Sequence, residues 1–160
     1  MSPLPDIEEP VLTVEDLIGK HKSILGLDGV QRFHISRQDV WSDSIAAFKS
    51  HEFKVLAKPR VSFDGEPGVD AGGLSREYAG LLRQALFSSK VNMFEGKENR
   101  KLPIYSIEGI HSRLYYLVGK MVAYLIIHTG VGIPCLSAAA YKYIASGSMD
   151  VAADTCCTDD

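Results

Sequence analysis

The sequence predicts an α+β fold that is mainly α-helical and has a few short strands. Apolar residues recur at helical spacing in several segments, and two short runs alternate between apolar and polar residues. The helical segments are longer and more numerous than the alternating ones. With 160 residues, 46% hydrophobic and 23% charged, the composition is that of a globular domain and excludes a wholly disordered chain or a collagen-like fibre.

The N-terminal third combines one short helix with the alternating runs. Thr13 can accept a hydrogen bond at a helix start, and Asp16 follows three residues later, which is the pattern of a capping box. We therefore expect a helix from this point to a stop at Gly26. Alternation over 32–37 and around 61–63 predicts two strands.

Four further segments have helical periodicity. The clearest one carries a single apolar stripe made of Leu74, Tyr78, Leu81, Leu82, Ala85 and Leu86. Asp70 is the residue we expect to cap its start. The other helices are expected over Val40–Ser50, Leu114–Ile127 and Leu136–Ala145. Leu114–Ile127 is very apolar, but it is interrupted by Lys120 and is shorter than the ~20 residues of a membrane span, so we expect a core helix.

The remaining segments are expected to be loops, a short strand, helix C-termini and the two terminal parts of the chain. Residues 91–101 form a loop anchored by Met93 and Phe94, residues 102–105 form a strand, and glycines 130 and 147 end the last two helices. We divide the chain into an arm with a short helix (1–29), a folded part (30–147) and an acidic, unstructured tail (148–160).

Charge is distributed unevenly along the chain. All 17 lysines and arginines lie between Lys20 and Lys142, whereas nine of the 20 acids lie outside that range. A basic middle can attract nucleic acid or an acidic protein. The basic residues are scattered and no RNA-stacking motif accompanies them, so we interpret them as solvated surface charge and do not expect nucleic acid as a partner. The acidic first ten residues do not resemble a secretory leader, and we expect an intracellular protein, cytoplasmic or nuclear.

The glycine-rich segment Gly65–Gly73 lies between a strand and a helix, where phosphates often bind. Leu74 and Ser75 follow the last glycine in place of the Lys and Ser/Thr of a P-loop, and the carboxylates nearby would repel a phosphate. The spacing also fails for an EF-hand, because its sixth position would be Val69 instead of glycine. We expect a structural role, with Gly72 and Gly73 allowing close backbone approach.

No catalytic, metal or cofactor site is predicted from the residues. Cys135 lies in an apolar setting typical of a core residue, and Cys156 and Cys157 lie among acids that raise a thiol pKa. The histidines are dispersed, without the regular ligand spacing of a zinc site; they are His21, His34, His51, His111 and His128.

The stretch from Val61 to Tyr78 resembles the signature near the start of a HECT domain, the catalytic domain of one class of E3 ubiquitin ligases. The matching residues are Gly65, Glu66, Gly68, Asp70, Gly72, Gly73, Arg76, Glu77 and Tyr78. The order of the flanking segments agrees over about residues 31–147, and the Gly119–Lys120 pair resembles a Gly–Lys or Gly–Arg pair of the family. The likeness is greatest to the divergent branch of the G2/M-phase-specific ligase.

The resemblance implies the first part of a HECT N-lobe and, as partners, a ubiquitin-conjugating enzyme, ubiquitin and a protein substrate. HECT ligases carry ubiquitin as a thioester on a cysteine of a C-terminal lobe, and the conjugating enzyme docks on a later part of the N-lobe. The sequence contains no clear counterpart of either region. We therefore expect a truncated fragment with no catalytic residue, inactive alone. The alternative is a non-catalytic binding module or decoy in the ubiquitin pathway.

Overall fold

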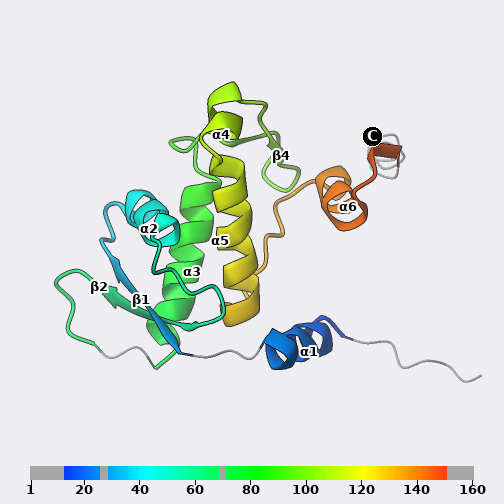
Figure 1. The fold of residues 1–160 in the computed structure, drawn as a ribbon. Helices are drawn as coiled ribbons and strands as arrows, with labels where there is room; N and C mark the ends of the chain where they lie inside the picture. The colour runs from blue at the N-terminus through cyan, green and yellow to red at the C-terminus, as the bar shows by residue number, and fades with distance from the viewer. Residues whose placement is uncertain (1–12, 26–28, 69–70, 151–160) are drawn as a thin grey trace, which may run out of the picture.

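The structure is a computed structural model that describes residues 13–25, 29–68 and 71–150 (Figure 1). In this part of the chain the helices are α1 (Val14–Leu25), α2 (Val40–Lys49), α3 (Gly73–Leu86), α4 (Ile107–His111), α5 (Leu114–Thr129) and α6 (Ala138–Ser146). The strands are β1 (Val30–Ile35), β2 (Lys58–Phe63), β3 (Phe94–Glu95) and β4 (Leu102–Pro103). The predicted α+β, mainly helical fold is confirmed.

A parallel β–α–β unit begins the folded part. Strands β1 and β2 pair in parallel, with Phe33 opposite Val61 and Ile35 opposite Phe63, and α2 is the crossover between them. A parallel pair requires such a crossover because the chain must return to the same end of the sheet. These four side chains are all buried on one face of the sheet, so alternation along each strand leaves the other face exposed.

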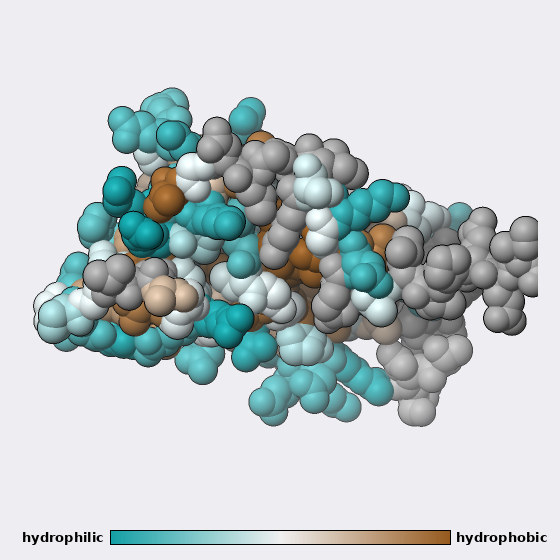
Figure 2. Space-filling model, turned by 90° about the horizontal axis from the view of Figure 1, so that it is seen from below, coloured by the Kyte–Doolittle hydropathy of each residue, from teal (hydrophilic) through white to brown (hydrophobic). Residues whose placement is uncertain are grey.

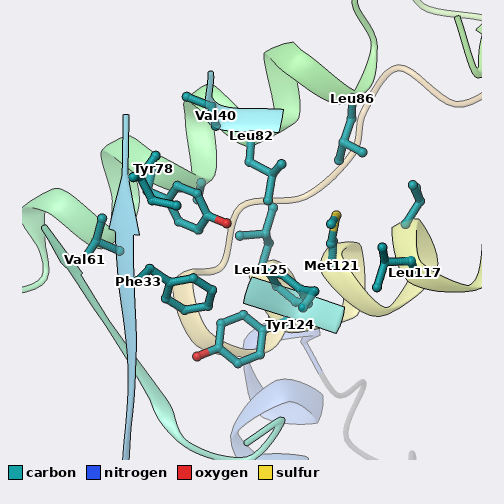
Figure 3. Close-up of a cluster of buried hydrophobic side chains, with 14 of the residues drawn as sticks. Phe33, Val40, Val61, Tyr78, Leu82, Leu86, Leu117, Met121, Tyr124 and Leu125 are labelled. Atoms are coloured by element: carbon teal, nitrogen blue, oxygen red, sulfur yellow. The ribbon is translucent and has the colours of Figure 1, made fainter. Parts of the chain in front are cut away.

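Helices α3 and α5 lie side by side and complete the core with α2 and the sheet (Figures 1 and 3). Five aromatic rings meet where these elements converge: Phe33, Phe48, Phe53, Tyr78 and Tyr124. Phe33 has ring centroids within 5.3–6.3 Å of each of the other four. Such tilted and edge-on contacts add to the free energy of burying the rings. Around the ring cluster, Leu82, Leu86 and Met121 fill the space between α3 and α5 (Figure 3).

The sequence located most helices to within a few residues. Thr13 and Asp16 form the predicted capping box, in which Asp16 N donates to Thr13 Oγ1 over 3.1 Å and Thr13 N donates to Asp16 Oδ2 over 3.0 Å. Helix α5 is the predicted core helix and ends at Gly130, whose φ is +72°. Gly147 ends α6 in the same way, with a φ of +68°. Gly26 and Asp70, the expected stop of α1 and cap of α3, lie outside the described residues.

Several expectations were wrong in position. The first strand begins at Val30 because β1 pairs with β2 along its whole length, two residues earlier than predicted. Helix α4 was not predicted, since five residues are too few for a periodic signal; Ser106 caps it by accepting a hydrogen bond from Gly109 N. Met149 and Asp150, expected in the unstructured tail, have helical backbone.

The surface is mostly polar in the view from below, with hydrophobic residues visible in places between hydrophilic ones (Figure 2). None of the described helices is long and apolar enough to cross a membrane. In the described residues no three His, Cys, Asp or Glu side chains lie close enough to hold a metal ion.

Candidate functional site

The candidate site is the signature segment, which runs from the end of β2 into α3. The chain leaves β2 in a turn in which Glu66 N donates to Phe63 O over 3.1 Å. Gly65 has a φ of +75° in this turn, a conformation that glycine adopts without steric cost. Asp64 N donates to Ile35 O over 3.0 Å, which ties the start of the loop to the end of β1.

Arg37, just after β1, holds the loop and the helix together. Its Nε donates to Glu66 Oε1 and its Nη2 to Glu66 Oε2 over 3.0 Å, while Nη1 donates to Glu77 Oε1 over 2.7 Å. The guanidinium also lies 4.0 Å from the centroid of the Phe63 ring. One arginine therefore contacts β2, the loop and α3. We call these four residues the arginine clamp.

The arginine clamp gives two acidic residues of the signature, Glu66 and Glu77, a structural role. The side chains of Arg37, Glu66 and Glu77 are 39%, 44% and 44% exposed, so the pairing is partly screened by water. The hydrogen bonds to Arg37 lower the pKa of Glu66, and the same bonds raise the pKa of Arg37 above its already high value. A fixed guanidinium with both carboxylates already bound is a structural joint and not an acid–base pair.

The clamp predicts a loss of stability in acid. The pKa of Glu66 is lowered on folding, so the carboxylate contributes stability that is present above its unfolded pKa and is lost as the pH falls through its folded pKa. Thermal unfolding of the natural chain and of Glu66→Gln, followed by circular dichroism from pH 7 to pH 3, measures this. We expect the difference between the two midpoints to shrink as the pH falls. A constant difference would contradict the prediction.

The glycines of the signature differ in whether their backbone conformation requires glycine. Gly72 is the residue before α3 and has a φ of +106°, which disfavours any side chain. A Cβ added at Gly72 or Gly73 would meet no described atom within 4 Å. Among the described residues, no backbone comes close to either glycine, and the positive φ of Gly72 explains why glycine is needed there. A Cβ at Gly68 would lie 3.6 Å from Leu74 Cδ1, an ordinary contact.

Two glycine-to-alanine substitutions should have opposite effects on stability. Gly119 lies inside α5, is exposed, and has no described atom within 4 Å of an added Cβ, so Gly119→Ala should stabilise the protein by roughly 1 kcal/mol. Gly72→Ala should destabilise it by about 1–2 kcal/mol because alanine would adopt a left-handed conformation. Urea unfolding of both variants measures the difference. Equal effects of the same sign would contradict this explanation of the two positions.

Tyr78 is the signature residue whose side chain packs in the hydrophobic core. It is 1% exposed, and its hydroxyl lies 2.8 Å from Ser44 Oγ, which in turn donates to Val40 O over 2.6 Å. A serine hydroxyl has one hydrogen, and Ser44 donates it to Val40 O. The Tyr78 hydroxyl is therefore the donor to Ser44 Oγ. Burial raises the pKa of Tyr78 well above 10. This chain of hydrogen bonds fixes α3 against α2.

The side chain of Lys120, in the Gly119–Lys120 pair, extends from α5 to the end of α2 and to the segment that follows α2. Its Nζ donates to Phe48 O over 3.2 Å and lies 4.2 Å from the centroid of the Phe53 ring. The lysine thus satisfies a carbonyl near the end of α2 and gains a cation–π contact. Arg76, by contrast, is exposed on α3.

The described cysteine is poorly suited to covalent chemistry. Cys135 lies between α5 and α6 and is only partly buried, so the expected core position is wrong. It lines an open depression together with Arg83, Glu98 and Lys101. Burial raises its pKa despite the two nearby cations, whereas a nucleophilic cysteine requires a lowered pKa. Cys156 and Cys157 lie outside the described residues.

Sequence reasoning found the acids of the site but not their partner. Arg37 lies at the end of the strand predicted over 32–37 and is not assigned to the site from the sequence, nor are Phe63 and Ser44. The arginine lies 29 residues from Glu66 and 40 from Glu77. The sequence does contain one signal for this pairing. Two acids of the signature and an arginine at the end of the first predicted strand carry opposite charges that can balance each other.

The sequence is similar to those of several E3 ubiquitin-protein ligases. The chain is 32% identical over 108 residues to the E3 ubiquitin-protein ligase pub1 of Schizosaccharomyces pombe and 28% identical over 116 residues to the probable E3 ubiquitin-protein ligase HUL4 of Eremothecium gossypii. The chain resembles HECT-type E3 ubiquitin ligases. The resemblance stated from the signature is confirmed. The G2/M phase-specific E3 ubiquitin-protein ligase of Homo sapiens is 29% identical over 103 residues.

These matches cover 66% of the chain for HUL4, 64% for pub1 and 62% for the human ligase, but only 14% of each relative. The chain therefore corresponds to about one seventh of the length of these E3 ligases. No protein-family model matches it.

Proposed function

We propose that residues 30–147 are the first part of a HECT N-lobe and that the chain has no ubiquitin-transferase activity by itself. The observation that carries this proposal is the arginine clamp: the acidic side chains of the signature, Glu66 and Glu77, are both bound to Arg37. Tyr78 and Lys120 likewise bind groups of the fold. Support comes also from Cys135, whose pKa is raised when a thioester-forming cysteine would need it lowered.

In a complete ligase, this part would serve as a scaffold. The partners proposed for the full domain are a ubiquitin-conjugating enzyme, ubiquitin and a protein substrate, met inside the cell, in the cytoplasm or nucleus. The resemblance implies that the conjugating enzyme docks on a later part of the N-lobe, so no docking site for it is proposed in this chain. The eleven signature residues, from Gly65 to Tyr78 together with the Gly119–Lys120 pair, are proposed as structural.

An in vitro charging assay tests the proposal. The chain is incubated with activating enzyme, a panel of conjugating enzymes, ATP and ubiquitin, and the products are separated with and without reductant. We expect no reductant-sensitive adduct, while a complete HECT ligase in a parallel reaction is charged. A reductant-sensitive adduct that disappears in Cys156→Ala or Cys135→Ala would overturn the proposal, because either cysteine would then form the thioester.

A second function, a non-catalytic binding module or decoy in the ubiquitin pathway, is favoured by the continuous core. One cluster of buried side chains joins β1, α2, β2, α3 and α5, as a module that folds alone requires. A single cooperative thermal transition, with the same midpoint by near- and far-ultraviolet circular dichroism, would support this function. Loss of the near-ultraviolet signal without a transition would exclude it.

A further inference from the structure

The outer face of the β1–β2 sheet carries a cluster of basic side chains. Alternation along the strands places Phe33 and Val61 in the core and the neighbouring residues on the opposite face. That face presents the exposed side chains of Arg32, His34, Lys58 and Arg60, a set that we call the basic face.

The two arginines of the basic face oppose each other. Arg32 lies directly opposite Arg60 in the register of the parallel strands, and adjacent strands are only about 4.8 Å apart. Like charges in this arrangement destabilise a sheet. Within residues 13–25, 29–68 and 71–150, neither guanidinium forms a salt bridge with a carboxylate. Arg37, by contrast, has two carboxylate partners. The basic face is thus an uncompensated positive surface.

A groove extends the basic face along the margin of β1. Its lining comes from β1, the end of α2 and the segment that follows α2: Val30, Gln31, Arg32, Ala47, Ser50, Glu52 and Lys54. Arg32 belongs to both the groove and the basic face. The sheet consists of β1 and β2 in the described chain, so the margin of β1 away from β2 has no strand beside it. An extended peptide can lie along such a margin and place alternate side chains over the sheet.

We propose that the basic face and this groove bind an acidic, extended peptide segment of a partner protein. Charge complementarity selects the anionic partner: an acidic side chain of the peptide would relieve the repulsion between Arg32 and Arg60. Protein is favoured over single-stranded nucleic acid because, among the described residues, the basic face has no Phe, Tyr or Trp on which bases could stack. This proposal does not depend on the proposed function.

Binding of a fluorescein-labelled poly-glutamate peptide of about eight residues to the full chain, measured by fluorescence anisotropy at low salt, tests the proposal. We expect saturable binding that weakens about tenfold in Arg60→Glu, because a peptide contact is replaced by repulsion. The same substitution places a carboxylate opposite Arg32, so the thermal midpoint should stay equal or rise. If the measured midpoint is equal or higher, the loss of binding is not caused by unfolding.

Two further variants serve as controls. Glu52→Gln removes the acid of the groove and should tighten binding, whereas Lys97→Glu, an exposed residue in the turn between β3 and β4, should leave it unchanged. The proposal is overturned if the peptide does not bind, if Arg60→Glu and Lys97→Glu weaken binding equally, or if an oligothymidylate of similar length binds more tightly than the peptide.

Discussion

Replacing Phe33 with alanine is expected to lower the free energy of unfolding by about 3–5 kcal/mol, the usual cost of deleting a buried phenylalanine ring. The side chain is 1% exposed, and its ring contacts four other rings that belong to α2, α3, α5 and the segment after α2. Removing it opens a cavity at the point where all these elements meet, and the surrounding rings can close that cavity only in part.

Urea unfolding followed by tryptophan fluorescence and circular dichroism measures this loss. Tyr105→Ala is the matched control, since Tyr105 is 80% exposed and its removal should change the free energy of unfolding by less than about 0.5 kcal/mol. A loss below about 1 kcal/mol for Phe33→Ala would mean that the ring cluster does not hold the signature helix to the sheet.

Ser44→Ala is expected to destabilise the protein more than Tyr78→Phe, although both remove the same hydrogen bond. Ser44→Ala leaves the Tyr78 hydroxyl as a buried donor without an acceptor, at a cost of about 1–3 kcal/mol. Tyr78→Phe leaves Ser44 still donating to Val40 O, and should cost about 0.5–1.5 kcal/mol. Equal losses, or the reverse order, would contradict the assigned direction of the hydrogen bond.

The burial of Tyr78 also predicts how stability changes at alkaline pH. Burial raises the pKa of Tyr78 on folding, so its contribution to stability is fully present below its unfolded pKa of about 10 and is lost as the pH rises through its folded pKa. Thermal midpoints of the natural chain should therefore fall above about pH 10, and those of Tyr78→Phe should fall less steeply.

Local patterns in the sequence were sufficient for most of the fold. The apolar stripe of α3 and the apolar run of α5 predicted core helices because helical burial repeats along a single segment. The pattern could not predict that β1 begins at Val30, since the length of that strand is set by pairing with Lys58 on β2. It also could not predict α4, which is shorter than the window from which periodicity is recognised.

The candidate site was predictable in part. The signature acids and glycines were found because they lie within one segment and resemble those of a family. The arginine clamp depends on contacts between residues far apart in sequence, and no local pattern specifies that Arg37 binds both Glu66 and Glu77. The conformation of Gly72 likewise depends on how the loop enters α3; the sequence shows the glycine but not its positive φ.

A double-mutant cycle on Arg37→Ala and Glu66→Gln tests most directly whether the signature acts as a structural joint. Free energies of unfolding are measured at pH 7 for the natural chain, both single variants and the double variant. If the clamp holds the loop to β1 and α3, each single variant is destabilised and the double variant loses less than the sum of the two, since the shared interaction can be lost only once. Strictly additive losses, or single variants as stable as the natural chain, would contradict this account.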